Sequence, residues 1–155
     1  MNFTIRAARP EEAGELTRIA LKSKGHWGYS EEQLRHWLDG FLAVSADYVR
    51  ANRVWVADID SSPVGFAAVK EMDSGAELDH LWILPECMGN GVGKALFARA
   101  AGHVAGTGRR ELVFTSDPHA DGFYEKMGAQ RIGVHHSDFQ QRKLTIFRFI
   151  VKPGV

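Results

Sequence analysis

The sequence predicts a mixed α/β domain in which helices flank a mostly antiparallel central sheet. In some segments apolar residues recur every second position, as in strands, and in others about every 3.6 positions, as in helices, and the two kinds of segment alternate along the chain. The segments follow the order β-α-α-β-β-β-α-β-α-β-β, so that a meander of strands leads into a helix that crosses to a further strand. One glycine-rich stretch, residues 88–94, joins a strand to a helix and indicates a ligand cleft there.

The N-terminal segments are predicted to be one strand and two helices. Residues 3–7 alternate between apolar and polar side chains, as a strand does. Pro10 and the acidic residues after it start a helix, because proline fits the first helical turn and negative charge favours its N-terminus. Ser30, with Gln33 three residues later, is a capping-box signal for a second helix.

The remaining segments follow from turn residues and from changes of period. The turn Asp60-Ser61-Ser62-Pro63 predicts a hairpin between two apolar strands. The helix after the glycine-rich stretch is expected to end at Gly106, and a shorter helix starts near Pro118. The predicted strands cover residues 53–59, 64–70, 77–84, 111–115, 129–134 and 143–151, and the predicted helices cover about 91–105 and 117–127.

Composition predicts one domain over residues 1–155 and a small-molecule or peptide partner. A chain of 155 residues with 45% hydrophobic residues fills one core. Lys and Arg number 19, as do Asp and Glu, so no basic field favours nucleic acid. The single cysteine, Cys87, forms no internal disulfide, and no apolar run is long enough to span a membrane. We therefore expect a protein of the reducing cytoplasm.

The stretch from Met88 to Lys94 is predicted to hold an anion. Glycines let successive backbone N–H groups point at one spot, and the start of the following helix adds free donors and the positive end of its dipole. A nucleotide-triphosphate loop would need glycine at Met88 and a hydroxyl at Ala95, and a dinucleotide fingerprint would need glycine at Lys94. Neither pattern fits. A turn that only lets helix and strand pack closely is the structural alternative.

What remains is Gly-x-Gly at Gly91 and Gly93, after an apolar strand and Pro85 and before an alanine- and leucine-rich helix. This resembles the acetyl-CoA pyrophosphate loop of the GNAT superfamily of N-acetyltransferases, Gln/Arg-x-x-Gly-x-Gly/Ala, with Met88 at the Gln/Arg position. The family also has the predicted order of elements. The resemblance implies acetyl-CoA as co-substrate, without a metal, held by Met88, Gly89, Asn90, Gly91, Val92, Gly93 and Lys94.

A second segment, residues 117–129, is similar to the GNAT pattern Asn-x-x-Ala-x-x-Phe-Tyr-Glu-Lys-x-Gly-Phe. The resemblance implies that Tyr124 is the general acid that protonates the leaving thiolate. A phenol with a reference pKa of about 10 suits this role. The alternative is a core tyrosine whose hydroxyl finds one partner. Asp117 replaces the family's asparagine, which binds the pantetheine arm, and could instead only cap the following helix.

The strand over residues 77–84 is expected to carry further chemistry. In GNAT enzymes its exposed main chain, here Leu81, Trp82 and Ile83, pairs with the pantetheine amides as an added strand would. The attacking amine must lose a proton, and Glu77 is the leading candidate for the base. Asp79 and His80 lie on the same strand, and a water relay is the alternative.

Acceptor specificity is expected to come from exposed rings. Trp27 and Tyr29 lie in a glycine-containing connector between the first two helices, where they could stack on an apolar or cationic substrate. His80 and His136 complete the predicted acceptor site. A hydrophobic lid that only fixes the second helix is the alternative for the rings. His136 and its neighbour face opposite ways on a strand and lack a third ligand, so we expect no metal.

These inferences predict an N-acetyltransferase that moves an acetyl group from acetyl-CoA to a primary amine of a small molecule or peptide, by direct attack in a ternary complex. The alternative is a non-catalytic acyl-CoA-binding sensor or regulatory module. The buried thiol of Cys87 is expected to pack and not to act as a nucleophile, because this chemistry needs no acyl-enzyme. The strand-rich C-terminus also allows a homodimer.

Overall fold

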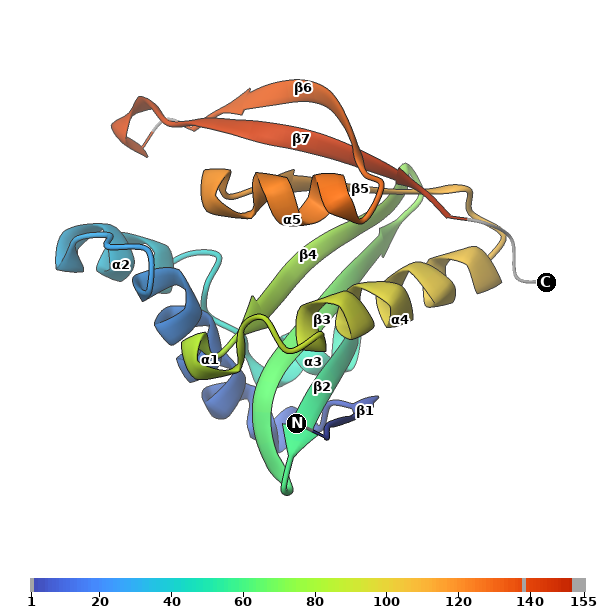
Figure 1. Ribbon diagram of the computed structural model, residues 1–155. Coiled ribbons are helices and arrows are strands. Elements are labelled where there is room, and N and C mark those ends of the chain that lie inside the picture. Colours follow the sequence, from blue (N-terminus) through green and yellow to red (C-terminus); the bar gives the residue numbers. More distant parts are fainter. Residues whose placement is uncertain (1, 138, 152–155) are drawn as a thin grey trace. The chain divides into compact units, whose positions relative to one another are not determined.

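The computed structural model describes residues 2–137 and 139–151. Its strands form one sheet in the order β1-β2-β3-β4-β5-β7-β6 (Figure 1). By its contacts the chain divides into two compact units, which we describe separately. Unit 1 comprises Met1–Lys70 and Asp79–Ala100, and unit 2 comprises Glu71–Leu78 and Ala101–Val155. No helix in the described part of the chain combines the length and the apolar character needed to cross a membrane.

The predicted fold class is confirmed. The pairs β1–β2, β2–β3, β5–β7 and β6–β7 are antiparallel, and β4–β5 is parallel. Unit 1 contains β1 (Thr4–Ala7), α1 (Ala13–Gly25), α2 (Glu31–Leu38), α3 (Ala46–Ala51), β2 (Arg53–Ile59), most of β3 (Ser62–Met72) and the end of β4 (Gly75–Ile83). Unit 2 contains the start of β4, β5 (Glu111–Ser116), α5 (Asp121–Lys126), β6 (Gln130–His136) and β7 (Lys143–Ile150). Helix α4 (Val92–Gly106) contributes residues to both units.

Local sequence signals explain the ends of several elements. The Ser30 hydroxyl accepts a hydrogen bond from the Gln33 backbone N–H, and the Gln33 side chain accepts one from the Ser30 N–H, so the predicted capping box is confirmed. Asp60 and Ser61 have positive φ angles of 50° and 64° and form a two-residue hairpin turn. Strand β3 therefore starts at Ser62, within the four-residue turn that the sequence predicts.

Helix α3 was not predicted from the sequence. Its N-terminus has a common type of cap, in which the Ser45 hydroxyl accepts a hydrogen bond from the Tyr48 backbone N–H. The helix has six residues and buries only Val49, so no apolar stripe develops. In α4 the residues Val92, Leu96 and Val104 are buried, while Ala95 is only half-buried. The buried face follows Leu96 and Phe97 at helical spacing and leaves Ala95 at its margin.

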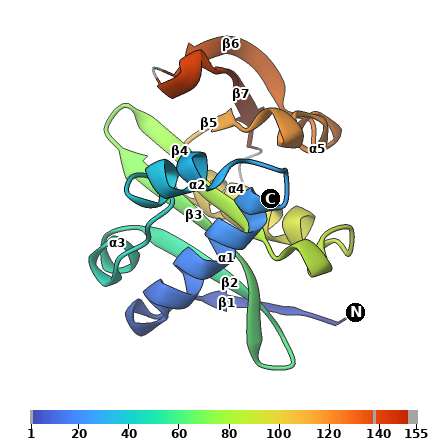
Figure 2. The same ribbon diagram turned by 90° about the vertical axis from the view of Figure 1, so that its left-hand side faces the viewer.

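Two faces of the unit 1 sheet are covered by different helices. Figure 2 shows α1 crossing in front of these strands, and Figure 1 shows the start of α4 on the other side. On the α4 side Gly65 makes a close approach. A Cβ atom there would lie 2.8 Å from Ile83 Cδ1 and 3.0 Å from the Trp82 carbonyl oxygen. The absence of a side chain at Gly65 thus lets β3, β4 and α4 pack together.

Unit 2 is built on an aromatic layer between β5 and β7. Phe114 and Phe147 are register partners of this antiparallel pair, both are buried, and their ring centroids are 5.6 Å apart. Helix α5 packs on this layer through Tyr124, whose ring centroid is 4.5 Å from that of Phe114. These contacts fix the helix that carries the predicted general acid.

We predict that Gly65→Ala lowers the free energy of unfolding by about 1–3 kcal/mol, because the new methyl group overlaps backbone and side-chain atoms of β4. Urea denaturation measures the change. The control is Gly102→Ala in α4, where a Cβ atom would meet nothing within 4 Å. There alanine should raise the free energy of unfolding by about 0.5–1 kcal/mol, because it favours a helix more than glycine does. A Gly65→Ala protein as stable as the wild type would contradict the close approach.

Candidate active site

The glycine-rich stretch forms a turn that leads from β4 into α4. Strand β4 ends at Ile83, a short 3-10 turn covers Pro85–Cys87, and α4 begins at Val92. Gly89 and Gly91 both have φ of +83°, a left-handed conformation that side chains rarely adopt, whereas a Cβ atom at either would meet nothing within 4 Å. Backbone conformation, and not crowding, is therefore why glycine fits these two positions.

Backbone donors gather where this turn meets the helix. The Ala95 N–H donates to the Gly91 carbonyl oxygen at 3.0 Å and makes the first helical hydrogen bond. The N–H groups of Val92, Gly93 and Lys94 precede that bond, so the helix itself offers them no acceptor. The helix dipole adds partial positive charge at the same point, and the exposed Lys94 side chain adds a full charge nearby. The arrangement suits an anion with several oxygens, such as a pyrophosphate.

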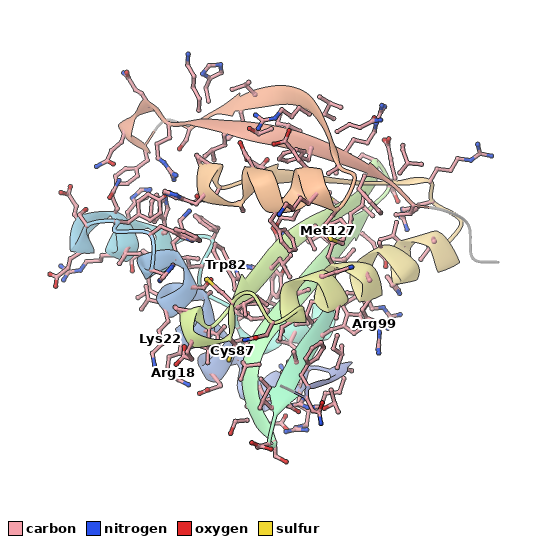
Figure 3. The ribbon with its side chains drawn as sticks, viewed as in Figure 1. Arg18, Lys22, Trp82, Cys87, Arg99 and Met127 are labelled. Carbon is pink, nitrogen blue, oxygen red and sulfur yellow. The ribbon has the colours of Figure 1, made fainter. Side chains whose placement is uncertain are left out.

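Basic side chains of α1 lie on the same side of unit 1 as the residues before the loop. Figure 3 shows Arg18 and Lys22 beside the segment that carries Cys87. The pKa of Arg18 is raised, mainly by its hydrogen bond with Glu15 and to a smaller extent by the charge of Glu86. Cys87 is buried, and burial raises the pKa of its thiol. A buried, protonated thiol fits the packing role expected from the sequence.

Strand β4 presents its side chains in alternation. Ala76, Leu78 and His80 are buried, and the residues between them are half-buried. Beyond His80 the degree of burial no longer alternates, and Leu81, Trp82 and Ile83 are all half-buried. Pairing of this last main-chain segment with pantetheine stays a prediction.

His80 is buried with its imidazole engaged, although the sequence suggested a contact with the acceptor. The side chain of Trp82 donates from Nε1 to Nδ1 of His80 over 2.9 Å. Burial lowers the pKa of His80, and the charge of Lys70 lowers it further, while Asp79 acts in the opposite direction. His80 is thus neutral at pH 7 and orients the Trp82 ring. Its predicted contact with the acceptor remains untested.

Four aromatic side chains of unit 1 surround one ammonium group. Lys24, at the end of α1, is only 3% exposed. Its Nζ lies 4.4 Å from the ring centroid of Trp37 and 4.9 Å from that of Tyr29. The centroids of Phe41 and Trp82 are 5.8 and 5.9 Å away. We call these four rings, Tyr29, Trp37, Phe41 and Trp82, the ring cage. Desolvated cation–π contacts are each worth up to about 2 kcal/mol.

Tyr29, which the sequence suggests for the acceptor site, contacts Lys24, and the burial of Lys24 was not predicted; a contact of Tyr29 with the acceptor stays a prediction. Tyr29 lies in the ring cage, whereas Trp27 is 41% exposed and makes an edge contact with His26 at 4.7 Å between ring centroids. A signal for Lys24 was present, because it continues the apolar stripe of α1 four residues after the buried Ala20. A lysine at such a position is more often a surface residue that snorkels, which is why the signal is easily overlooked.

Tyr124 is 8% exposed and its ring lies among three others in unit 2, those of Phe114, Phe123 and Phe147. Burial raises the pKa of its hydroxyl, and the negative charge of Asp117 raises it further. Tyr124 therefore keeps its proton throughout the neutral pH range. Both readings left open by the sequence, a core tyrosine and a proton donor, are compatible with this environment.

Asp117 caps the short turn before α5. Its Oδ1 accepts from the backbone N–H of His119 at 2.9 Å, and Oδ2 lies 3.6 Å from the Arg142 guanidinium. The capping role that the sequence left open is thus seen, while a contact of Asp117 with pantetheine stays a prediction.

Glu77 lies in unit 2 and lines a pocket of about 330 Å³ together with residues of β5 and of the β3–β4 turn. It pairs with Val113, whereas Phe114, on which Tyr124 packs, points to the other face of β5. The two predicted proton-transfer groups therefore lie on opposite faces of the β4–β5 pair.

His136 lies exposed on β6, opposite Lys143. Its role in the acceptor site stays a prediction. Over residues 2–137 and 139–151, no group of three or more His, Cys, Asp or Glu side chains is arranged to hold a metal ion.

We predict that His80 makes the protein less stable below pH 6.5. Its pKa is lowered from 6.5 in the folded state, so the unfolded chain binds a proton that the folded chain excludes. The stabilisation is complete above pH 6.5 and is lost as the pH falls below it, by up to about 1.4 kcal/mol per pH unit. Urea denaturation between pH 5 and 7.5 should show a flatter profile for His80→Gln than for the wild type. The exposed His135→Gln is the control, and equal slopes in all three proteins would refute the assignment.

Comparison with known proteins identifies the family. A model of the acetyltransferase (GNAT) domain matches residues 28–146. The peptidyl-lysine N-acetyltransferase YjaB of Salmonella typhimurium is 30% identical over 144 residues, which cover 89% of this chain and 90% of that protein. An aminoglycoside N(6')-acetyltransferase type 1 of Stenotrophomonas maltophilia is 30% identical over 128 residues, covering 73% and 74%.

Solved structures agree on the fold. A PaiA N-acetyltransferase from Thermoplasma acidophilum, solved in complex with coenzyme A, superposes with a TM-score of 0.78 at 23% identity, over 96% of this chain and 98% of that one. The fold, the glycine-rich turn and the family model lead to one conclusion: the chain belongs to the GNAT family of acetyltransferases.

Proposed function

We propose that this protein transfers an acetyl group from acetyl-CoA to a primary amine. The observation that carries the proposal is the turn from Met88 to Lys94, whose two left-handed glycines and first helical turn direct backbone donors at one point. A GNAT relative of the same fold, PaiA, was solved with coenzyme A, which supports the same ligand here. Acetyl-CoA acts as a co-substrate in this reaction.

The N–H groups at the start of α4 would bind the pyrophosphate of coenzyme A, with Lys94 adding charge. Most of these contacts would be made by the main chain, so Met88 in place of the family's Gln or Arg removes only the donors of a single side chain. Leu81, Trp82 and Ile83, half-buried at the end of β4, would pair with the pantetheine arm.

Tyr124 would protonate the sulfur that leaves when the amine attacks the thioester carbonyl. The new C–N bond forms as the C–S bond breaks, and the hydroxyl proton of Tyr124 passes to the thiolate. Burial raises the pKa of Tyr124, so the group is fully protonated at the start of each turnover. The same shift makes its phenolate a strong base, which favours rapid recovery of the proton from water.

The proton of the attacking amine would pass to Glu77, directly or through water. Glu77 lines a pocket and is half-buried, so water can reach it. Positioning of the amine and the thioester supplies most of the remaining rate enhancement.

The acceptor class is supported by the two curated relatives, whose names specify lysine and aminoglycoside amines. Both are primary amines that are protonated in water, so an acceptor site should recognise positive charge. Tyr29, Trp27 and His136 supply rings on exposed or half-exposed parts of the chain. We therefore expect a cationic primary amine of a small molecule or peptide.

We predict that Tyr124→Phe lowers kcat with an amine acceptor at least about a hundredfold, because general acid catalysis contributes about 10²–10⁴-fold. The Kd of coenzyme A should stay within about twofold, since the phenyl ring keeps the contacts with Phe114 and Phe147. A thiol-release assay with a panel of amines measures kcat, and calorimetry measures the Kd. Phe123→Leu, in the same helix, serves as a packing control.

The outcomes separate the two hypotheses. A wild-type protein that binds coenzyme A but releases no thiol with any amine would favour the non-catalytic sensor. A Tyr124→Phe protein with unchanged kcat would remove Tyr124 from the mechanism while leaving the transferase activity in place.

A further inference from the structure

The ring cage of unit 1 is a site for a positive charge, and the ammonium group of Lys24 occupies it. Lys24 is the only lysine among the described residues that is placed in the buried core. Burying an ammonium group is costly unless its surroundings stabilise the charge. Here the faces of four rings contribute to this stabilisation, and Tyr29 and Trp37 also hold each other in an edge contact at 4.8 Å.

Two features of the ring cage would not be expected of side chains that only pack the core. Trp82 is oriented by its hydrogen bond to the buried His80, so this wall is fixed. Phe41, by contrast, is 50% exposed, so its ring reaches the surface. Trp82 also belongs to the segment, with Leu81 and Ile83, whose main chain is expected to pair with the pantetheine arm. The ring cage thus combines one ring held by a buried hydrogen bond, next to the expected pantetheine-binding segment, with one ring exposed at the surface.

We propose that the ring cage is the ammonium-binding part of the acceptor site and that Lys24 occupies it as an internal competitor, which a cationic acceptor displaces. The proposal rests on the proposed acetyltransferase function and narrows its substrate class. Lys24 carries the same primary ammonium on a four-carbon chain as an alkylammonium acceptor would, and that chain has several rotatable bonds through which the ammonium can be withdrawn from the rings.

The chemistry of the cage specifies the acceptor further. The rings stabilise a charged nitrogen, so an amine bound in the cage stays protonated and is not a nucleophile. The amine that attacks the thioester must then be a second one on the same molecule. We infer an alkyl diamine or longer polyamine, with one nitrogen held by the cage and another that loses its proton and forms the amide.

Competition between Lys24 and the acceptor predicts the direction in which the KM for the acceptor changes when Lys24 is removed. If the cage is filled by Lys24 most of the time, the apparent affinity for an acceptor falls in proportion to the fraction of open cage. Removing the competing ammonium must therefore lower the KM for the acceptor. If Lys24 were only a structural part of unit 1, its removal would loosen the rings and leave that KM unchanged or raise it.

The first experiment needs no turnover and tests the cage alone. Lys24→Ala removes the resident ammonium, and n-butylammonium is added as the probe. We expect a saturable rise in Tm of at least about 3 °C for Lys24→Ala. Neutral n-butanol should give no such rise in this variant. Lys22→Ala, an exposed lysine of the same helix, is the matched control and should respond like the wild type, with a rise of under about 1 °C. Equal responses to n-butylammonium in all three proteins would overturn the proposal.

The second experiment uses Lys24→Met, whose unbranched side chain fills the same space without a charge and serves if the alanine variant does not fold. We expect the KM for diaminobutane to fall at least about threefold relative to the wild type, with the KM for acetyl-CoA unchanged. In the wild type, diaminobutane should have a KM at least about fivefold below that of butylamine. A Lys24→Met KM at or above the wild-type value, or no preference for the diamine, would contradict the proposal.

The two readouts also separate this proposal from the proposed function. Rescue of Lys24→Ala by n-butylammonium without acetyl transfer to any amine would support the cage and refute the transferase. Acetyl transfer without rescue and without the fall in KM would support the transferase and refute the cage.

Discussion

Strand β4 alternates its side chains between two environments, and this alternation determines where each candidate group of unit 1 lies. His80 is buried and accepts a hydrogen bond from Trp82, which helps to enclose Lys24. Ile83 points the other way and approaches the backbone of β3 so closely that only glycine fits at position 65. A slip of one residue would exchange the two sets of side chains. It would remove the ring from the cage and drive Ile83 out of its contact with β3.

The two units supply different kinds of chemistry. Unit 1 contributes positive potential, through the N–H groups at the start of α4 and the exposed Lys94, and a cage of rings that stabilises an ammonium. Unit 2 contributes the two groups that we propose for proton transfer: a buried tyrosine held in the protonated form and a half-buried glutamate in a pocket. Binding and proton transfer thus rest on different elements, so variants of each unit should affect Kd and kcat separately.

Local signals predicted much of this fold, and the burial of polar groups was the hardest part to predict. The capping box at Ser30, the hairpin turn at Asp60 and the glycine-rich turn depend on neighbouring residues, so their sequence patterns were sufficient. Helix α3 was not predicted because a six-residue helix is too short to show a periodic stripe of apolar residues. The burial of Lys24 and His80 depends on rings that are distant in sequence, such as Trp82 for Lys24 and Phe66 for His80. No local pattern specifies such contacts.

Calorimetric titration with coenzyme A measures whether the turn from Met88 to Lys94 binds this ligand through its backbone. Alanine at Gly91, where φ is +83°, should disturb the turn without filling any occupied space, while Gly102→Ala in the same helix leaves the turn unchanged. The account predicts binding to the wild type and to Gly102→Ala with equal Kd, and a Kd at least about tenfold weaker for Gly91→Ala. Absence of binding to the wild type, or equal binding to Gly91→Ala, would contradict it.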